Sequence, residues 1–89
     1  MIKVEKLILD ILKPHQPNAL EFASALAEKG NNIQVTLTVA AVDEKTESVV
    51  VEIEGNDINF EHISERIKTL GASVHSIDKV QVSNASPPE

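Results

Sequence analysis

LILDILKPHQPN, residues 7–18, is the stretch that decides the fold of this 89-residue chain. In its first half, leucine or isoleucine stands at positions 7, 9 and 11, so that these side chains would share one face of a β-strand. Two prolines then disfavour helix and remove backbone donors, which ends the strand. Asn18, with Glu21 three residues later, resembles a capping box. The stretch therefore predicts a strand over 2–12, a loop over 13–18, and a helix that Gly30 ends.

The rest of the chain repeats this order of elements. Apolar residues alternate over 33–42 and 48–54 on either side of a short polar turn, which predicts a β-hairpin. Apolar residues at 60, 63, 67 and 70 predict a helix between Asn59 and Gly71. A last strand is expected over 72–82, with one shift of phase near 76–79, as a β-bulge would cause.

Two βαβ halves with right-handed crossovers predict one α+β domain, residues 1–82, of the ferredoxin-like βαββαβ kind. We expect a four-stranded antiparallel sheet in the order 4-1-3-2 with both helices on one face, and therefore an open second face. The polar residues 83–89 predict a disordered tail.

Composition narrows the function classes. A net charge of −6 is the wrong sign for a protein that neutralises phosphates, so we expect no nucleic-acid partner. The apolar runs are too short to span a bilayer, and charged residues stand where a signal peptide would be apolar, so we expect no membrane partner. The absence of cysteine excludes disulfides and thiolate metal sites and indicates the cytoplasm.

Four short motifs carry a family resemblance. They are LDILKPH at 9–15, Val42-Asp43 with Thr46-Glu47, IEG at 53–55 and HSID at 75–78. Together they resemble the uncharacterised, mainly archaeal family known as domain of unknown function 211. The resemblance implies a ferredoxin-like fold and a homo-oligomer, and it implies no activity.

The topology brings several polar residues to one rim of the sheet, where the first strand ends and the last begins. These residues are Asp10, Lys13, His15, Asp43, Glu44, Glu47 and His75. Carboxylates alone favour calcium or magnesium, and imidazole favours zinc or nickel. The alternative is structural, with Lys13 neutralising a carboxylate and the histidines bonding to backbone.

The open face of the sheet carries Asp10 beside Glu52 of the neighbouring strand. These two acids predict either a carboxylate pair capable of acid–base work or a solvated polar face. The same face carries Ile8, Leu12 and Val50, an apolar patch of the kind that marks protein contacts. The open face and an edge strand are therefore the two expected routes to a homo-oligomer.

These patterns predict a non-enzymatic, self-associating module that binds a small ligand or a divalent cation. The alternatives are a small enzyme using a carboxylate pair and a purely structural homo-oligomer. The expected ligand-binding residues are Asp10, Lys13, His15, Glu52 and His75, and the expected metal ligands are Asp10, His15, Asp43, Glu47, His75 and Asp78.

Overall fold

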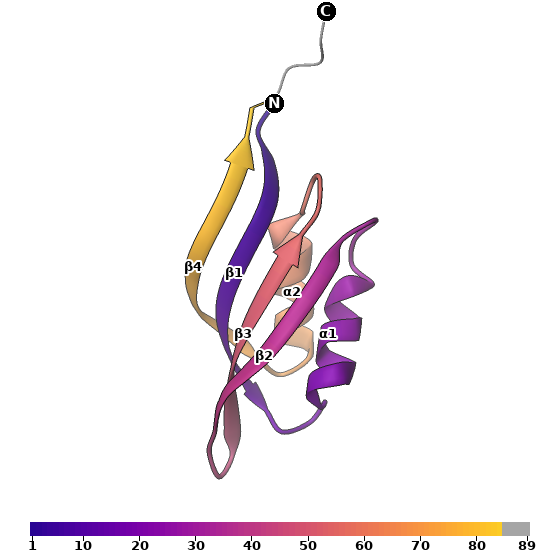
Figure 1. The fold of residues 1–89 in the computed structure, drawn as a ribbon. Coiled ribbons are helices and arrows are strands. Elements are labelled where there is room, and N and C mark those ends of the chain that lie inside the picture. The colour runs from indigo at the N-terminus through magenta and orange to yellow at the C-terminus, as the bar shows by residue number, and fades with distance from the viewer. Residues whose placement is uncertain (85–89) are drawn as a thin grey trace, which may run out of the picture.

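The computed structural model describes residues 1–84, which form six elements in the predicted βαββαβ order (Figure 1). The elements are β1 (Lys3–Pro14), α1 (Ala19–Ala27), β2 (Gln34–Val42), β3 (Thr46–Glu54), α2 (Phe60–Thr69) and β4 (Ser73–Ser83). The antiparallel sheet has the order β2-β3-β1-β4, which is the predicted order 4-1-3-2 counted from the other edge. The ferredoxin-like fold is thus confirmed. β4 runs to Ser83, and residues 85–89 of the predicted tail lie outside the described residues.

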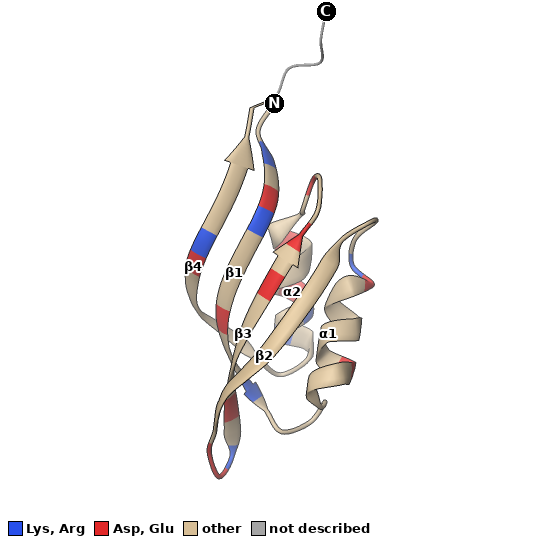
Figure 2. Cartoon of the chain, in the orientation of Figure 1, with Lys and Arg blue, Asp and Glu red and all other residues tan. Residues whose placement is uncertain are grey.

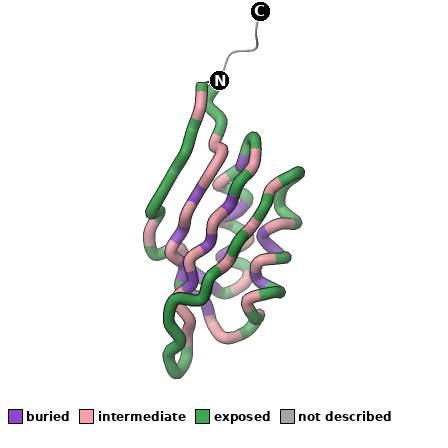
Figure 3. Tube along the Cα trace, in the orientation of Figure 1, coloured by how far each residue is buried: buried purple, intermediate pink, exposed green. Residues whose placement is uncertain are grey.

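The core lies between the two central strands and the helices (Figure 3). Every second residue of β1 and β3 points toward the helices, as alternation requires. The fully buried side chains include Leu9, Ile11, Val49, Val51, Ile53, Phe22, Leu26 and Ile67. Both edge strands, β2 and β4, are mainly exposed. The opposite face of the sheet carries no helix (Figure 1).

Both helices begin as the sequence predicts. The Asn18 side chain accepts a hydrogen bond from the Glu21 amide at 2.9 Å, and the Glu21 carboxylate accepts one from the Asn18 amide at 3.1 Å. Asn59 caps α2 by accepting from the His62 amide at 3.2 Å. Gly71 follows α2 with a φ of +83°, a conformation that suits glycine. The capping box and the end of α2 at Gly71 are therefore confirmed. Helix α1 ends at Ala27 with Glu28 as its C-cap, three residues before Gly30, which was predicted to end it.

β1 continues two residues further than predicted. Lys13 pairs with Glu47 and Pro14 with Thr46, so the loop begins at His15 and not at Lys13. Pro14 is tolerated because the pairing of β1 with β4 ends at Leu12, so that at Pro14 β1 is paired with β3 alone, as an edge strand would be. The extension places Lys13 on the helix side of the sheet, in line with Ile11, where its side chain is fully buried.

Strand β4 contains more bulges than predicted. Val74 pairs with Ile11 and Ser76 with Asp10, so that His75 is an extra residue on β4. A bulge of this kind bends the strand and changes the direction of its side chains.

A second extra residue on β4 is Asp78, because Ile77 pairs with Leu9 and Lys79 with Ile8. The sequence predicted one shift of phase near 76–79, whereas β4 has two extra residues, and a third shift lies on β1 between Val4 and Lys6. Each bulge resets the alternation, and so the apolar residues of β4 recur at spacings of three and still share one face.

The N-terminal end of β1 and the C-terminal end of β4 extend beyond both helices (Figure 1). The chain ends meet there, since the Met1 ammonium donates to Asn84 Oδ1 at 3.0 Å. The molecule is elongated, with principal extents of 55 × 22 × 17 Å. Among residues 1–84, neither helix is long and apolar enough to cross a membrane.

Candidate functional site

The open face holds a pocket of about 280 Å³ where β4, β1 and β3 lie side by side. It is lined by Asp10, Leu12, Ser48 and His75, which we call the Asp10–His75 pocket. Leu12 and Ser48 are directly opposite each other on β1 and β3, so they form its floor. Asp10 and His75 were predicted as ligand residues. Ser48 was missed, although its even position places it on the same face as Val50.

His75 lines this pocket from the bulge in β4. Val74 pairs with Ile11 on the helix side, so alternation turns His75 to the open face, and the extra residue lets Ser76 lie opposite Asp10 on that face as well. Because His75 is the extra residue opposite the Asp10–Ile11 step, its side chain lies beside Asp10. A residue that interrupts backbone pairing thus supplies the imidazole.

The Asp10–His75 pocket offers a carboxylate and an imidazole to a bound ion. None of the four ion pairs formed within residues 1–84 includes Asp10, although the residue is only partly exposed. Carboxylate and imidazole together suit zinc, nickel or copper. No three acidic or histidine side chains within the described residues are grouped as a metal site. The pocket therefore supplies at most two protein ligands from one chain.

A second polar cluster lies on the opposite side of the sheet and consists of Lys13, Glu47 and His15. Lys13 is fully buried, and its ammonium donates to Glu47 Oε1 at 3.0 Å and to the Pro14 carbonyl at 2.8 Å. It also lies 5.9 Å from the centre of the Phe22 ring. These contacts offset the cost of removing the ammonium from water. The predicted neutralisation of Lys13 is present, with Glu47 as its partner.

His15 connects the β1–α1 loop to the β2–β3 hairpin. Its Nδ1 lies 3.0 Å from Glu47 Oε2, and its Nε2 lies 3.0 Å from the Glu44 carbonyl oxygen. The hydrogen bond to Glu47, followed by that to Glu44, raises the pKa of His15. The hydrogen bonds from His15 and then from Lys13 lower the pKa of Glu47. The three side chains bind one another and hold the β2–β3 hairpin against the end of β1 and the loop that follows it.

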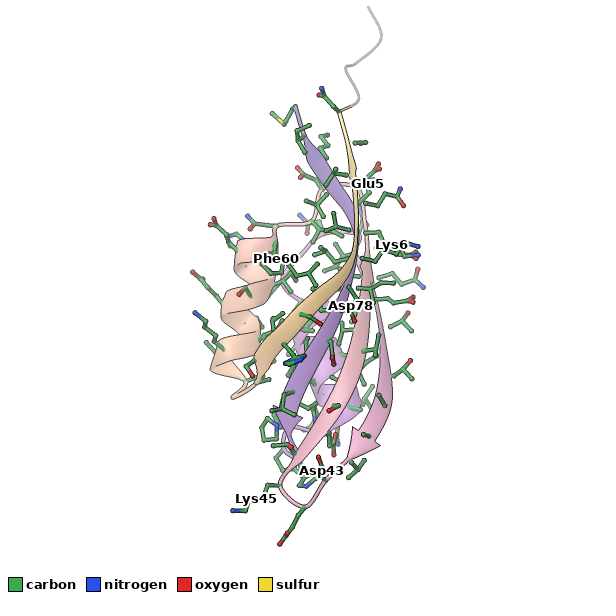
Figure 4. All side chains as sticks on the ribbon, turned by 90° about the vertical axis from the view of Figure 1, so that its left-hand side faces the viewer. Glu5, Lys6, Asp43, Lys45, Phe60 and Asp78 are labelled. Carbon is green, nitrogen blue, oxygen red and sulfur yellow. The ribbon has the colours of Figure 1, made fainter. Side chains whose placement is uncertain are left out.

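The remaining predicted site residues lie apart from both groups. Asp43 is at the tip of the hairpin and Asp78 is in the middle of β4, well separated in Figure 4. The Asp78 carboxylate accepts from Ser76 Oγ at 2.7 Å. Glu52 shares the open face with Asp10, but Val50 is the residue opposite Asp10. Asp10 and Glu52 are therefore diagonal neighbours, which are typically about 7–8 Å apart.

A further pocket of about 280 Å³ lies beside α2 on the helix side and involves none of the predicted residues. It is lined by Lys29, His62, Glu65, Arg66 and Thr69. Arg66 Nη2 lies 3.7 Å from Glu28 Oε2, and Glu65 adds a second carboxylate, so the charges of the pocket are balanced. The Asp10–His75 pocket is the stronger candidate because its carboxylate has no cationic partner among the described residues.

Two comparisons place the chain in a family. The model of the family described as "Uncharacterized ArCR", domain of unknown function 211, matches residues 5–85. An uncharacterised protein of the archaeon Methanocaldococcus jannaschii is 44% identical over 77 residues, which cover 86% of this chain and 79% of that protein. Both findings confirm the resemblance that the four motifs carry. The chain belongs to the domain of unknown function 211 family.

Proposed function

We propose that this protein is a non-enzymatic, self-associating module that binds a divalent cation in the Asp10–His75 pocket. The observation that supports the proposal is the β4 bulge, which places an imidazole beside a carboxylate that forms no ion pair within residues 1–84. Water, a small ligand or a second copy would fill the other coordination positions. The absence of cysteine suits a reducing compartment, and we place the module in the cytoplasm.

Zinc or nickel fits the pocket better than calcium or magnesium. Calcium takes six to eight oxygen ligands and magnesium prefers an oxygen octahedron, whereas this pocket pairs one carboxylate with one imidazole. Zinc accepts nitrogen and oxygen ligands in a four-coordinate arrangement. Calcium and magnesium therefore serve as negative controls.

Thermal unfolding with each cation tests the proposal. Zinc or nickel is expected to raise the Tm of the whole chain, because an ion that binds the folded state stabilises it. Asp10→Asn and His75→Ala should each remove the increase. Asp78→Asn and His62→Ala remove an acid and a histidine elsewhere and should retain it. An equal increase in His75→Ala, or no increase in the unaltered protein, would refute the cation site.

The Lys13–Glu47–His15 cluster is the main competitor for an added cation. His15→Ala separates the two possibilities, since it leaves Asp10 and His75 in place. If the zinc-dependent increase in Tm survives in His15→Ala and disappears in His75→Ala, the cation binds on the open face. The reverse pattern would move the site to the hairpin cluster and contradict the proposal.

The enzyme alternative receives less support. A carboxylate pair needs two acids close enough to share a proton, and the β1–β3 register places Val50 opposite Asp10, with Glu52 diagonal to it. A structural homo-oligomer without a ligand remains the second candidate, and exposed apolar residues on the edge strands favour it. The two candidates share self-association and differ in the cation, so the zinc or nickel dependence of the Tm distinguishes them: a structural homo-oligomer would show none.

A further inference from the structure

A stripe of polar side chains runs along α2 and lines the helix-side pocket of about 280 Å³. The stripe consists of His62, Glu65, Arg66 and Thr69. Their spacings of three and four residues place them on one side of the helix. Lys29, two residues past the end of α1, completes the lining, so that both helices contribute to it. We call this cavity the Lys29–Arg66 pocket.

The guanidinium of Arg66 lacks hydrogen-bond acceptors. Its Nε is buried and has no hydrogen-bond partner within residues 1–84. Its Nη2 lies 3.7 Å from Glu28 Oε2, which is too long for a hydrogen bond, and the Glu28 side chain is 72% exposed. Figure 2 shows red next to blue at the end of α1, where Glu28 and Lys29 follow one another. Buried donors in proteins are nearly always satisfied by protein, water or a bound ion, so this guanidinium calls for an acceptor.

The lining side chains differ in what they offer a ligand. Lys29 and Arg66 can only donate hydrogen bonds, and His62 has at least one ring N–H in either protonation state. Thr69 Oγ1 donates to the Arg66 carbonyl at 2.8 Å, which leaves its oxygen free to accept. The Glu65 carboxylate accepts only. Neither Lys29 nor Glu65 belongs to any of the four ion pairs formed by the described part of the chain.

The two bases favour a small oxyanion. A guanidinium binds two oxygens of a phosphate or carboxylate group side by side, and an ammonium adds a compact positive charge. Glu28 is mostly exposed and can turn to water when an oxyanion takes its place beside Arg66. The volume of the pocket lies below the range of about 300–1,000 Å³ that is typical of sites for drug-sized ligands. A ligand of only a few heavy atoms fits it.

The carboxylate of Glu65 determines which oxyanion is accepted. A fully deprotonated anion such as sulfate would be repelled by this carboxylate and would leave it without a donor. Hydrogenphosphate keeps one proton, which it can donate to Glu65 while its other oxygens accept from Lys29 and Arg66. We infer that the Lys29–Arg66 pocket binds inorganic phosphate in this form. The site is separate from the Asp10–His75 pocket, which lies on the open face, and it does not depend on self-association.

An NMR titration of the whole chain, followed by backbone amide chemical shifts, tests the inference. With a chelator present, at pH 8 and constant ionic strength, phosphate should cause saturable shifts at residues 28–30 and 62–69. Sulfate should not. Both anions are excluded from protein surfaces in general, so their comparison removes the common effect of salt. Equal saturable shifts with the two anions, or none with phosphate, would overturn the inference.

Arg66→Gln tests the donor side. It should weaken phosphate binding by about tenfold or more, because it removes the charge-assisted hydrogen bonds of the guanidinium. Lys68→Gln is the matched control, since Lys68 is an exposed base of the same helix that does not line the pocket. It should bind phosphate as the unaltered protein does. If both variants lose affinity equally, the general charge of α2 attracts the anion and the pocket assignment is wrong. The amide spectrum shows whether each variant is folded.

Glu65→Gln tests the acceptor side. The glutamine amide can donate, so this variant should bind sulfate and lose the preference for phosphate. Glu61→Gln removes an exposed acid of the same helix outside the pocket and should keep the preference. A preference that Glu65→Gln retains would contradict the role of Glu65.

Methyl phosphate separates free phosphate from a phosphate monoester. Its second pKa is about 6, so at pH 8 it has no proton to donate to Glu65. It should therefore bind at least about tenfold more weakly than inorganic phosphate. Equal binding of the two would overturn the assignment to free phosphate.

Discussion

His15 is the residue whose chemistry is most constrained by its neighbours. Both ring nitrogens lie 3.0 Å from oxygen acceptors, and neither the Glu47 carboxylate nor the Glu44 carbonyl can donate a hydrogen bond in return. Both hydrogen bonds form together only when both nitrogens carry protons. The doubly protonated ring therefore ties the hairpin to the β1–α1 loop, and loss of one proton breaks one of the two bonds.

Stability should fall as pH rises through the folded pKa of His15. That pKa is raised above the ordinary value of about 6.5, so the contribution of His15 is complete below that value and is lost above the folded one. Urea unfolding between pH 5.5 and 9 should show this decline in the unaltered protein. His15→Gln should flatten it, and His62→Gln should not. A decline that His15→Gln retains would contradict this assignment.

The pH dependence of stability that Glu47 contributes has the opposite sign to that of His15. The pKa of Glu47 is lowered, so its contribution is present above the ordinary carboxyl value and is lost as pH falls through the folded one. We therefore expect the cluster to stabilise the protein most between the carboxyl and imidazole titrations. The same urea series, extended below pH 5, measures this second limb.

At the scale of elements, spacing in the sequence predicts the strands and helices but not the exact path of β4. Val74, Ile77 and Val80 recur every third residue, and each spacing of three requires one extra residue if all three share a face. The spacing of the apolar residues was therefore sufficient to predict two bulges, although only one was predicted. Which residue becomes the extra one depends on pairing with β1, and for that reason the bulge at His75 could not be predicted from the sequence, although His75 and Asp10 were expected at one rim.

The predicted rim separates into two sites for a related reason. Lys13 and Glu47 stand at odd positions in line with the core residues of β1 and β3, whereas Asp10 stands at an even one. A sheet divides odd from even positions, so Lys13 and Asp10 cannot serve the same site. The sequence predicted that these residues share one rim of the sheet. Because the first strand was expected to end at Leu12, Lys13 was not assigned to either face of the sheet.

The capping box gives a prediction for helix α1. Asn18→Ala should lower the free energy of unfolding by about 1 kcal/mol, because it leaves the Glu21 amide without its acceptor. Urea unfolding measures the loss. Asn56→Ala, in an exposed loop, should change the stability by less than about 0.5 kcal/mol. Equal effects of the two substitutions would show that the cap contributes little.

At the scale of the whole molecule, the proposed self-association would link folding to concentration. If two copies unfold together, Tm should rise by about 4 °C for each tenfold increase in protein concentration, a value that follows from typical unfolding enthalpies per residue. Differential scanning calorimetry with a chelator provides the measurement, and a constant Tm in the unaltered protein would speak against a folded dimer.

The contact between Met1 and Asn84 has a practical consequence for rearranging the chain. Because the two ends meet at 3.0 Å, a short linker could join residue 84 to residue 1, and the hairpin tip near Asp43 and Lys45 offers a place to open new ends. Every strand pairing would survive this circular permutation. A tag fused to the present ends lies beside the paired ends of β1 and β4, whereas the permuted chain would carry its tags at the opposite pole of the molecule (Figure 1).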